Sequence, residues 1–364
     1  MSMQNREIKR DQNHFFVLGL MSGTSLDGLD IVAVHFELDN DGIWKYTIDK
    51  AETLSYSLQW EHQLDQAHLF SMQQMGHLNK AYTQWLSESI MIFIKKHKLQ
   101  ALDAICSTGH TVLHQPEKGI TVQLGNLPEI VKQLPCPVVC DFRTQDVALG
   151  GQGAPLVPVG DRLLFSQFDG CLNLGGFANL SKIKEKVPVA FDVCPFNRVL
   201  NPLSNKLGHA FDKGGQLAKE GKLIKPLFEQ LNHLPYYQKL GPKSLGREWV
   251  EAILFPILNQ FNEVPFIDVL HTYLHHCAHQ IGRLCNTGDL VLLTGGGAHN
   301  SFFVKLLSSY SRAQFQLPDT QTIDFKEALI FGFLGVLRLR GEVNCYAAVT
   351  GAKKDHVAGK IFFP

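Results

Sequence analysis

The stretch Gly19–Asp30 (GLMSGTSLDGLD) gathers side chains that can hold an anion. Its small and polar members are Ser22, Gly23, Thr24, Ser25, Asp27 and Gly28. Hydroxyl and backbone N–H groups in such a turn can bind phosphate oxygens, and a carboxylate can hold a hydrated cation. The alternative is a turn that only reverses the chain, in which glycines permit positive φ and aspartates cap local N–H groups.

The elements around this stretch repeat later in the chain. Alternating apolar runs at His14–Leu20 and Asp30–Phe36 predict a β-hairpin, and Gly170–Ile183 (GCLNLGGFANLSKI) shows the same strand, glycine turn and strand. Two halves that open alike predict a duplicated α/β unit. Because the first glycine loop leads into a strand, Rossmann and Walker-type sites, which lead into a helix, are disfavoured.

Further elements follow each hairpin. We expect strands at Trp44–Tyr56, Leu102–His110, Pro137–Arg143, Val187–Cys194 and Asp289–Thr294. We expect helices at Glu61–Lys98 with a break near Gly76, at Glu248–Gln260 with a kink at Pro256, at Pro265–Asn286 and at Phe325–Gly341.

Composition indicates an enzyme-like globular chain. The 364 residues are 45% hydrophobic and 19% charged, with 34 Lys and Arg against 34 Asp and Glu, so no net field favours nucleic acid or an anionic membrane. No apolar run approaches the ~18–20 residues of a membrane span, and residues 1–14 lack a secretion signal, which favours the cytoplasm. Cys136 and Cys140 are expected to be reduced core residues.

A set of motifs in fixed order resembles one known family, the anhydro-N-acetylmuramic acid kinases of the actin, sugar kinase and Hsp70 superfamily. The matching stretches are GLMSGTSLDGLD, GHTVLHQP, DFRTQDVALGGQGAPLVP, NLGGFANLS, FDKGGQLA, PKSLGREW, TGGGAHN and KEALIFGFLGVLRLRGEVN, between Phe16 and Gly351. The resemblance implies an α/β, two-lobed actin-like (ribonuclease H-like) duplicated fold with an interlobe cleft. Lobe I would be 1–140 plus 338–364, and lobe II 141–337.

The resemblance also implies an activity. ATP and 1,6-anhydro-N-acetylmuramic acid would bind in the cleft, and the 6-hydroxyl position would be phosphorylated while water opens the anhydro bridge, in peptidoglycan recycling. Mg²⁺ would accompany ATP, and the family likeness suggests a cytoplasmic homodimer without nucleic-acid or membrane partners. The alternatives are a kinase for another sugar or anhydro sugar, or a non-catalytic muropeptide or nucleotide sensor.

Residues that match the family's ATP site fall in three glycine turns. They are Gly23, Thr24, Ser25, Leu26, Asp27, Gly28, Leu29 and Asp30; Gly175, Gly176 and Asn179; and Gly295, Gly296, Gly297 and Asn300. Asp27, or else Asp30, would hold Mg²⁺ through water. The alternative for the turn at Gly295–Gly297 is a tight strand-to-helix corner that needs no ligand.

The remaining matches concern the sugar. Asp192 aligns with the family's general base, which would deprotonate the attacking water. Gly109, Thr111, Arg143, Asn197 and Glu327 would contact the substrate, with His114 nearby. Arg143 would clamp a carboxylate, unless it pairs with Asp141 or Asp146. Glu327 would face the cleft, unless it is a glutamate in the first turn of a helix.

One motif departs from the family pattern. Where the family reads D-T-G-P-G-N, this chain has Asp192, Val193, Cys194, Pro195, Phe196 and Asn197, and Asn201 replaces a usual aspartate. If Phe196 enters the sugar site, the substrate differs or activity is reduced.

A histidine row lies outside the resemblance. His271, His275 and His279 fall on one helical stripe, with His276 and Cys277 beside them. Two of these residues offer zinc ligands, but such helices more often pack or solvate their imidazoles.

Overall fold

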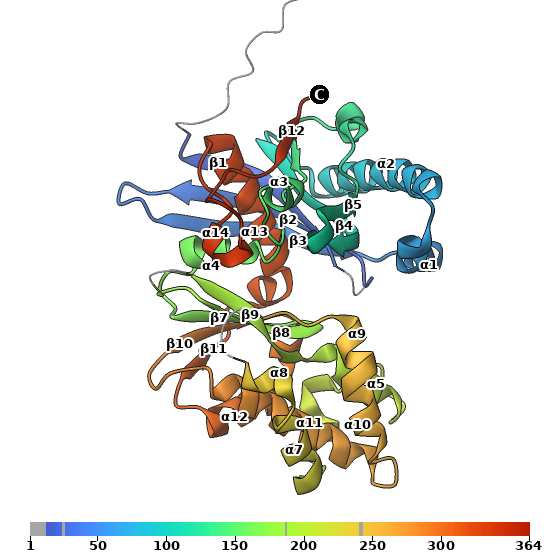
Figure 1. Cartoon of the computed structure of the whole chain (residues 1–364). Coiled ribbons are helices and arrows are strands. Elements are labelled where there is room, and N and C mark those ends of the chain that lie inside the picture. The colour runs from blue at the N-terminus through green and yellow to red at the C-terminus, as the bar shows by residue number, and fades with distance from the viewer. Residues whose placement is uncertain (1–11, 24–25, 186–187, 240–242) are drawn as a thin grey trace, which may run out of the picture. The chain divides into compact units, whose positions relative to one another are not determined.

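The computed structural model describes residues 12–23, 26–185, 188–239 and 243–364. These form two compact units, unit 1 (Met1–Leu164 and Phe325–Pro364) and unit 2 (Phe165–Asp324) (Figure 1). The segments 141–164 and 325–337 therefore belong to unit 1, whereas the sequence-based boundaries assign them to lobe II. A buried ion pair holds these segments together, with Lys326 Nζ 2.7 Å from Asp161 Oδ1.

Unit 1 contains, among the described residues, a seven-stranded sheet in the order β12-β6-β4-β1-β2-β3, with β5 paired to β4. The strands are β1 (His14–Ser22), β2 (Leu29–Leu38), β3 (Trp44–Leu54), β4 (Ala104–Gln115), β5 (Ile120–Leu124), β6 (Val138–Cys140) and β12 (Lys360–Phe362). β1, β2 and β3 are antiparallel, whereas β4 runs parallel to both β1 and β6.

Unit 2 repeats this arrangement. Its described sheet has the order β11-β10-β7-β8-β9, so both sheets place an antiparallel three-strand meander beside parallel strands. The strands are β7 (Gly170–Leu174), β8 (Phe177–Lys182), β9 (Val189–Pro195), β10 (Leu290–Thr294) and β11 (Gln314–Gln316). This confirms the predicted hairpins and the duplicated, ribonuclease H-like α/β fold.

Helices cover the sheets. In unit 1 they are α1 (Leu58–Gln66), α2 (Met72–His97), α3 (Thr144–Ala148), α4 (Val157–Leu164), α13 (Thr320–Arg340, which crosses the boundary between the units) and α14 (Ala347–Thr350). In unit 2 they are α5 (Asn197–Asn205), α6 (Gln216–Lys219), α7 (Lys225–Asn232), α8 (Pro235–Gln238), α9 (Arg247–Trp249), α10 (Phe255–Asn259), α11 (Phe266–Gly282) and α12 (Ser301–Tyr310).

The core of unit 1 follows from alternation along its strands. Leu18 and Leu20 of β1 share one buried cluster with Tyr82 and Leu86 of α2. Gly19 between them points the other way, where a Cβ would lie 2.1 Å from the carbonyl oxygen of Ala328 in α13. Glycine at this position lets the helix backbone approach the strand.

Three predicted helices differ from the observed ones. The break in the first lies at 67–71 rather than at Gly76, because Ser71 and Gln74 form a capping box that starts α2. A π-helical turn, Val250–Leu254, precedes Pro256 where a kink was expected. The last helix begins at Thr320, not Phe325. No helix in the described part of the chain is long and apolar enough to cross a bilayer.

Candidate functional site

The first glycine turn joins β1 to β2 in unit 1. Thr24 and Ser25 lie outside the described residues. The N–H of Leu26 points to the carbonyl oxygen of Gly23 at 3.4 Å. At Gly28 a Cβ would lie 2.5 Å from the carbonyl oxygen of Leu54, so only glycine fits against β3. Leu29 is buried at the start of β2, so the turn is anchored to the sheet on this side.

The two aspartates of this turn differ in their surroundings. Asp30 Oδ1 accepts a hydrogen bond from Thr53 Oγ1 at 2.6 Å. Asp27 is exposed and lines a shallow hollow together with Glu61 and Asp65. Mg²⁺ prefers oxygen ligands and keeps several of its waters, so an exposed carboxylate such as that of Asp27 fits a hydrated Mg²⁺.

A buried polar network lies directly behind the turn. Ser22 Oγ is hydrogen bonded to Tyr56 OH at 2.6 Å and to His110 Nδ1 at 2.8 Å, and Tyr56 OH lies 2.7 Å from Tyr82 OH. Burial lowers the pKa of His110 to about 4, so this imidazole is neutral at pH 7. Tyr56, Tyr82 and His110 are not among the site residues predicted from the sequence.

The strand predicted to end at His110 continues to Gln115, so residues 109–115 of the motif GHTVLHQP lie inside β4. β4 continues beyond the parallel β1 pairing and pairs with β5, with Thr111 opposite Gln123. Gly109 has φ of 65°, and a Cβ there would lie 2.4 Å from the carbonyl oxygen of Leu124. The glycine therefore provides the bend that β4 makes between its two partners. His114 Nδ1 contacts Thr121 Oγ1 at 3.1 Å.

Arg143 lies within electrostatic range of Glu327 in unit 1. Arg143 Nη1 donates to the carbonyl oxygen of Gly153 at 2.7 Å, and Arg143 Nε is buried without a hydrogen-bond partner among the described atoms. Burial lowers the pKa of the guanidinium, and the nearby Glu327 carboxylate opposes this shift. A half-buried guanidinium with an unused N–H is suited to binding a carboxylate.

Of the two aspartates near Arg143 in sequence, Asp146 contributes to the electrostatic environment of the guanidinium after Glu327, whereas Asp141 is engaged elsewhere. Asp141 pairs with Lys360, with Oδ2 and Nζ 2.8 Å apart. Asp146 Oδ2 accepts the N–H of Gly153 at 2.6 Å. Glu327 is not in a first helical turn, because α13 begins at Thr320. Arg143 therefore has Glu327 as its leading electrostatic partner.

The second glycine turn, Gly175 and Gly176, joins β7 to β8 in unit 2. The carbonyl oxygen of Gly176 accepts the N–H groups of Phe196 and Arg198 at 2.8 and 3.1 Å, and that of Gly175 accepts the N–H of Asn197 at 3.1 Å. Asn197 Nδ2 also donates to the carbonyl oxygen of Leu174 at 3.3 Å. Asn197 therefore positions the turn. A Cβ at Gly176 would meet no atom within 4 Å, so the turn surface beside it is open.

Asp192 lies opposite Asn179 on neighbouring strands of this sheet. Asn179 Nδ2 donates to Asp192 Oδ1 at 3.0 Å, and the N–H of Leu245 donates to Oδ2 at 2.9 Å. Burial raises the pKa of the Asp192 carboxyl, while these two hydrogen bonds oppose the shift. A fixed carboxylate with a raised pKa is a more effective general base.

The third glycine turn follows β10, which runs parallel to β7 and therefore ends at the same sheet edge. Gly295 has φ of 81°, and a Cβ there would lie 2.5 Å from Asn173 Oδ1. Gly296 is exposed, whereas Gly297 is buried. Asn300 caps α12, since its Oδ1 accepts the N–H of Phe303 at 2.9 Å. A nucleotide contact from Asn300 would therefore use its amide nitrogen.

The departure from the family motif is buried. Phe196 is 0% exposed, its ring centroid lies 4.7 Å from that of Phe303, and it occupies the space that a Cβ on Gly297 would need, 2.4 Å away. Val193 and Cys194 are also buried. Phe196 therefore does not enter a sugar site, contrary to the possibility considered from the sequence, and the substitutions are accommodated in the core of unit 2.

Three histidines of α11 each make one hydrogen bond to another protein group through Nδ1, while His276 Nε2 is buried without a hydrogen-bond partner among the described atoms. His271 Nδ1 bonds to the carbonyl oxygen of Ala218, His275 Nδ1 to Tyr310 OH, and His276 Nδ1 to Asn232 Oδ1, at 2.7, 2.8 and 2.7 Å. In the described part of the chain, these histidines do not form a three-ligand cluster. The packing alternative therefore accounts for them.

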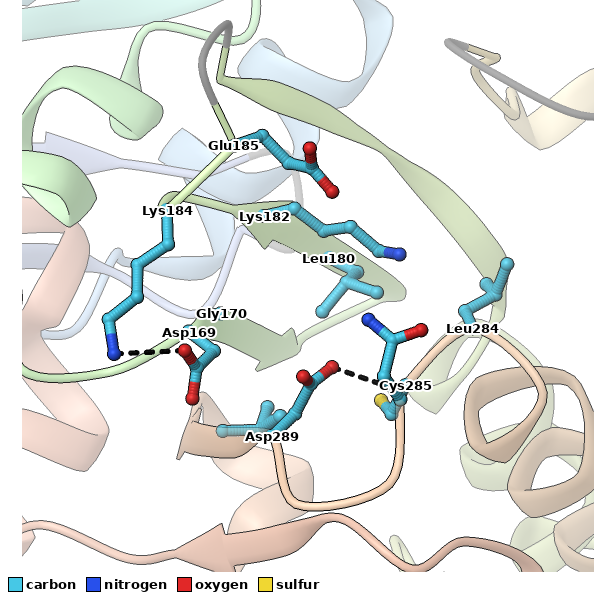
Figure 2. Close-up of a pocket in the computed structure, with 11 residues that line it drawn as sticks. Asp169, Gly170, Leu180, Lys182, Lys184, Glu185, Leu284, Cys285 and Asp289 are labelled. Carbon is cyan, nitrogen blue, oxygen red and sulfur yellow. Dashed lines mark hydrogen bonds and ion pairs between the residues drawn. The ribbon is translucent and has the colours of Figure 1, made fainter.

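A separate pocket of about 230 Å³ lies at the other edge of the unit 2 sheet, where β7 and β10 begin (Figure 2). Lys184 Nζ pairs with Asp169 Oδ1 at 2.9 Å, and Asp289 Oδ2 accepts the N–H of Asn286 at 2.7 Å. The pocket is smaller than the ~300–1,000 Å³ typical of ligand sites. Two of its carboxylates are therefore already engaged, and the glycine turns lie at the opposite ends of these strands.

Comparison with protein families identifies the family described as anhydro-N-acetylmuramic acid kinase, matched over residues 15–364. The chain is similar to the anhydro-N-acetylmuramic acid kinase of Pseudomonas syringae pv. tomato (strain ATCC BAA-871 / DC3000), 33% identical over 373 residues, with 96% of this chain and 99% of the relative covered. It is equally similar to that of Shewanella amazonensis (strain ATCC BAA-1098 / SB2B), 33% identical over 365 residues, with 95% and 98% covered.

Among solved structures, the chain is similar to component A of the (R)-2-hydroxyglutaryl-CoA dehydratase of Acidaminococcus fermentans, with a TM-score of 0.47, 11% identity, and coverage of 89% of this chain and 99% of that one. The activator of the 2-hydroxyisocaproyl-CoA dehydratase from Clostridium difficile with bound ADPNP gives a TM-score of 0.44 at 12% identity, with 90% and 96% covered. The match along residues 15–364 and the identity to its curated relatives establish that the chain belongs to the anhydro-N-acetylmuramic acid kinase family.

Proposed function

We propose that this chain transfers the terminal phosphoryl group of ATP to 1,6-anhydro-N-acetylmuramic acid while water opens the anhydro bridge, giving N-acetylmuramic acid 6-phosphate in peptidoglycan recycling. Family membership supports the kinase class and the sugar. The observation that carries the mechanism is Asp192, a carboxylate with a raised pKa that is held at both oxygens by Asn179 and Leu245.

In this mechanism Asp192 accepts a proton from the attacking water. The water oxygen forms a bond to the anomeric carbon as the bond from that carbon to the bridging oxygen breaks. The released oxygen at position 6 then bonds to the γ-phosphorus, and ADP leaves. Phosphoryl transfer depends mainly on positioning and charge stabilisation, which the glycine turns are suited to provide through their backbone.

The other residues have supporting roles in the proposal. The turn from Gly23 to Asp30 and the turns at Gly175–Gly176 and Gly295–Gly297 hold the nucleotide. Arg143, positioned by Gly153 and Glu327, binds the carboxylate of the sugar. Mg²⁺ held through water by Asp27 would neutralise charge on the phosphates. Asn197 acts by fixing the second turn.

Two broader features belong to the same proposal. The family resemblance supports a homodimer in the cytoplasm, which light scattering of the purified protein and fractionation of the native cells would test. The kinase for another sugar loses its main support, since Phe196 lies in the core. An assay with 1,6-anhydroglucose beside the proposed substrate compares the two, and ADP formation only with 1,6-anhydroglucose would contradict the proposal.

Asp192→Asn tests the base directly. The variant keeps the size of the side chain but loses the basic oxygen, so turnover should fall by about 10²–10⁴-fold while ATP binding stays nearly unchanged. ADP and phosphorylated sugar are followed with Mg·ATP and 1,6-anhydro-N-acetylmuramic acid. Asp289→Asn is the control, because Asp289 only caps a loop at the opposite sheet edge and its variant should retain activity. Retention of more than about a tenth of the wild-type rate in Asp192→Asn would exclude Asp192 as the base.

A further inference from the structure

Three side chains of different chemistry meet in the interior of unit 1, away from the residues assigned to phosphoryl transfer. Asp146 comes from α3, Cys345 precedes α14, and His356 pairs with Cys345 across an antiparallel bridge. Asp146 Oδ1 lies 3.1 Å from Cys345 Sγ and 3.6 Å from His356 Nε2. One ligand atom from each residue lies within 4.8 Å of the others, and all three residues are buried.

The orientation of His356 is that of a metal-binding imidazole. Its Nδ1 lies 3.2 Å from the carbonyl oxygen of Lys354 and donates to it, which leaves Nε2 as the nitrogen directed at the other two residues, as in metal-binding histidines. Nε2 is buried, has no hydrogen-bond partner among the described atoms, and faces the Asp146 carboxylate. Nε2 and Asp146 Oδ1 therefore lie 3.6 Å apart beside the Cys345 sulfur, which brings three possible ligand atoms around one point.

The Asp146 carboxylate is also oriented by hydrogen bonds from residues outside the three-residue cluster. Asp146 Oδ2 accepts the N–H of Gly153 at 2.6 Å, and Asp146 Oδ1 accepts Thr350 Oγ1 at 2.7 Å. Such outer hydrogen bonds orient metal-ligating carboxylates and are a regular part of metal sites. Thr350 adds an oxygen beside the three ligands.

We propose that Asp146, Cys345 and His356 form a zinc site. A thiolate, an imidazole and a carboxylate are the three protein ligands that Zn²⁺ accepts in tetrahedral sites. With metal–ligand bonds of about 2.0–2.3 Å, ligand atoms of such a tetrahedron lie about 3.3–3.6 Å apart. The observed 3.6 Å between His356 Nε2 and Asp146 Oδ1 falls in this range. The 3.1 Å between Cys345 Sγ and Asp146 Oδ1 is shorter, because without metal the thiol donates a hydrogen bond to the carboxylate, and metal binding would replace this proton. Mg²⁺ is disfavoured, because sulfur and nitrogen are poor ligands for a hard cation.

The site would connect the C-terminal segment to the loop that positions Arg143. Residues 341–364 contain little regular structure, only α14 and β12. Gly153 donates to Asp146 and accepts from Arg143 Nη1, so one residue joins the proposed zinc site and the proposed carboxylate clamp. The role of zinc here is structural, and the inference does not depend on the proposed sugar substrate.

The test measures metal binding on the whole untagged chain. Protein purified without chelator, or loaded with Zn²⁺ and desalted, should contain about one zinc per chain when measured by inductively coupled plasma mass spectrometry. Replacement by Co²⁺ should give a thiolate-to-cobalt charge-transfer band. Cys345→Ser should lose this band and most of the zinc, and His356→Gln should weaken zinc binding about 10-fold or more.

Cys285→Ser is the matched control, since Cys285 lies in unit 2 outside the cluster and its variant should keep zinc and the cobalt band. Zinc below about a tenth of an equivalent in the loaded wild type would overturn the proposal, and so would an unchanged cobalt band in Cys345→Ser. The zinc content of the wild-type protein tests the proposal even if the variants fail to fold. Zinc removal by a chelator should lower the midpoint of thermal unfolding, and an unchanged midpoint would contradict a structural role.

Discussion

The two hairpin turns occupy the same place in two sheets of the same topology, yet they are supported in different ways. Behind the β1–β2 turn of unit 1 lies a buried polar network of Ser22, Tyr56, Tyr82 and His110. Behind the β7–β8 turn of unit 2 lies the ring of Phe196, packed on Phe303 and on Gly297. The first support depends on hydrogen bonds and the second on shape.

This difference has energetic consequences. Buried hydroxyl and imidazole groups stabilise a fold only while every partner is present and uncharged, so the first turn is sensitive to pH and to loss of a single hydroxyl. The stabilisation by an aromatic ring packed against glycine does not change with pH, but it depends on how well the volume of the side chain fills the space. We therefore expect a change in pH to affect the support of the first turn, and a loss of side-chain volume to affect the support of the second.

The largest loss of stability is expected from Phe196→Ala. Removing a fully buried ring leaves a cavity beside Gly297, which costs about 3–5 kcal/mol in the free energy of unfolding. Urea denaturation measures this cost. Phe211→Ala is the control, because Phe211 is 57% exposed and its removal should change stability by about 0.5 kcal/mol or less. A loss below about 1 kcal/mol for Phe196→Ala would show that the ring does not support the turn.

A smaller effect is expected from pH at the first turn. The pKa of His110 is about 4 in the fold against 6.5 for a free imidazole, so the unfolded chain takes up the proton first as pH falls. The contribution of uncharged His110 to the free energy of unfolding is therefore fully present above about pH 6.5 and declines as the pH falls toward 4. Between pH 7 and 4, the stability difference between wild type and His110→Gln should shrink by about 3 kcal/mol.

Denaturation of both proteins across this pH range measures the change. The comparison between the two proteins removes the contributions of His275 and His276, whose pKa values are also lowered by burial. A constant difference across the range would mean that His110 is not held neutral.

Ser22→Ala should cost about 1–3 kcal/mol, because it removes the hydroxyl that Tyr56 and His110 share. Ser87→Ala provides the control in the same unit, since Ser87 Oγ is buried without a hydrogen-bond partner among the described atoms and its removal should be neutral or stabilising. Equal effects of the two substitutions, in thermal or urea unfolding, would contradict the network as a support.

The smallest effect on stability is expected from Gly176→Ala. A Cβ at Gly176 meets no atom within 4 Å and φ lies outside the left-handed region, so the change in stability should stay below about 1 kcal/mol. The added methyl group should nevertheless raise KM for ATP if phosphate approaches this turn. Gly297→Ala, which would overlap Phe196, serves as the destabilising comparison. An unchanged KM would place the phosphates elsewhere.

Local sequence patterns were sufficient to predict the two hairpins and the duplication of the α/β unit. Alternating apolar residues around a glycine turn specify each meander, and the glycines also mark where a backbone must bend or approach, as at Gly28 and Gly295. The break before α2 was predicted at Gly76 although a capping box, Ser71 with Gln74, was present in the sequence.

Features that depend on distant contacts were not predictable in this way. Tyr82 reaches the hydroxyl of Tyr56, and through it the network at Ser22, only because α2 packs on the sheet. Glu327 of α13 acts electrostatically on Arg143 although 184 positions separate them, and Cys345 meets Asp146 across 199 positions of sequence. Phe196 looked like a change in the pocket because nothing local shows that Gly297 makes room for it. These pairings are set by tertiary packing, which periodicity and motif spacing do not encode.

The pairing of β12 with β6 has a consequence for biosynthesis. Unit 2 is one continuous segment with a self-contained sheet, so it can acquire its structure while the ribosome is still translating the remainder. Unit 1 has to wait, because Lys360–Phe362 forms the margin of its sheet beside Val138–Cys140. Until those codons are read, the unpaired side of β6 is exposed in the nascent chain, and a chaperone that covers strand edges would protect it during that interval.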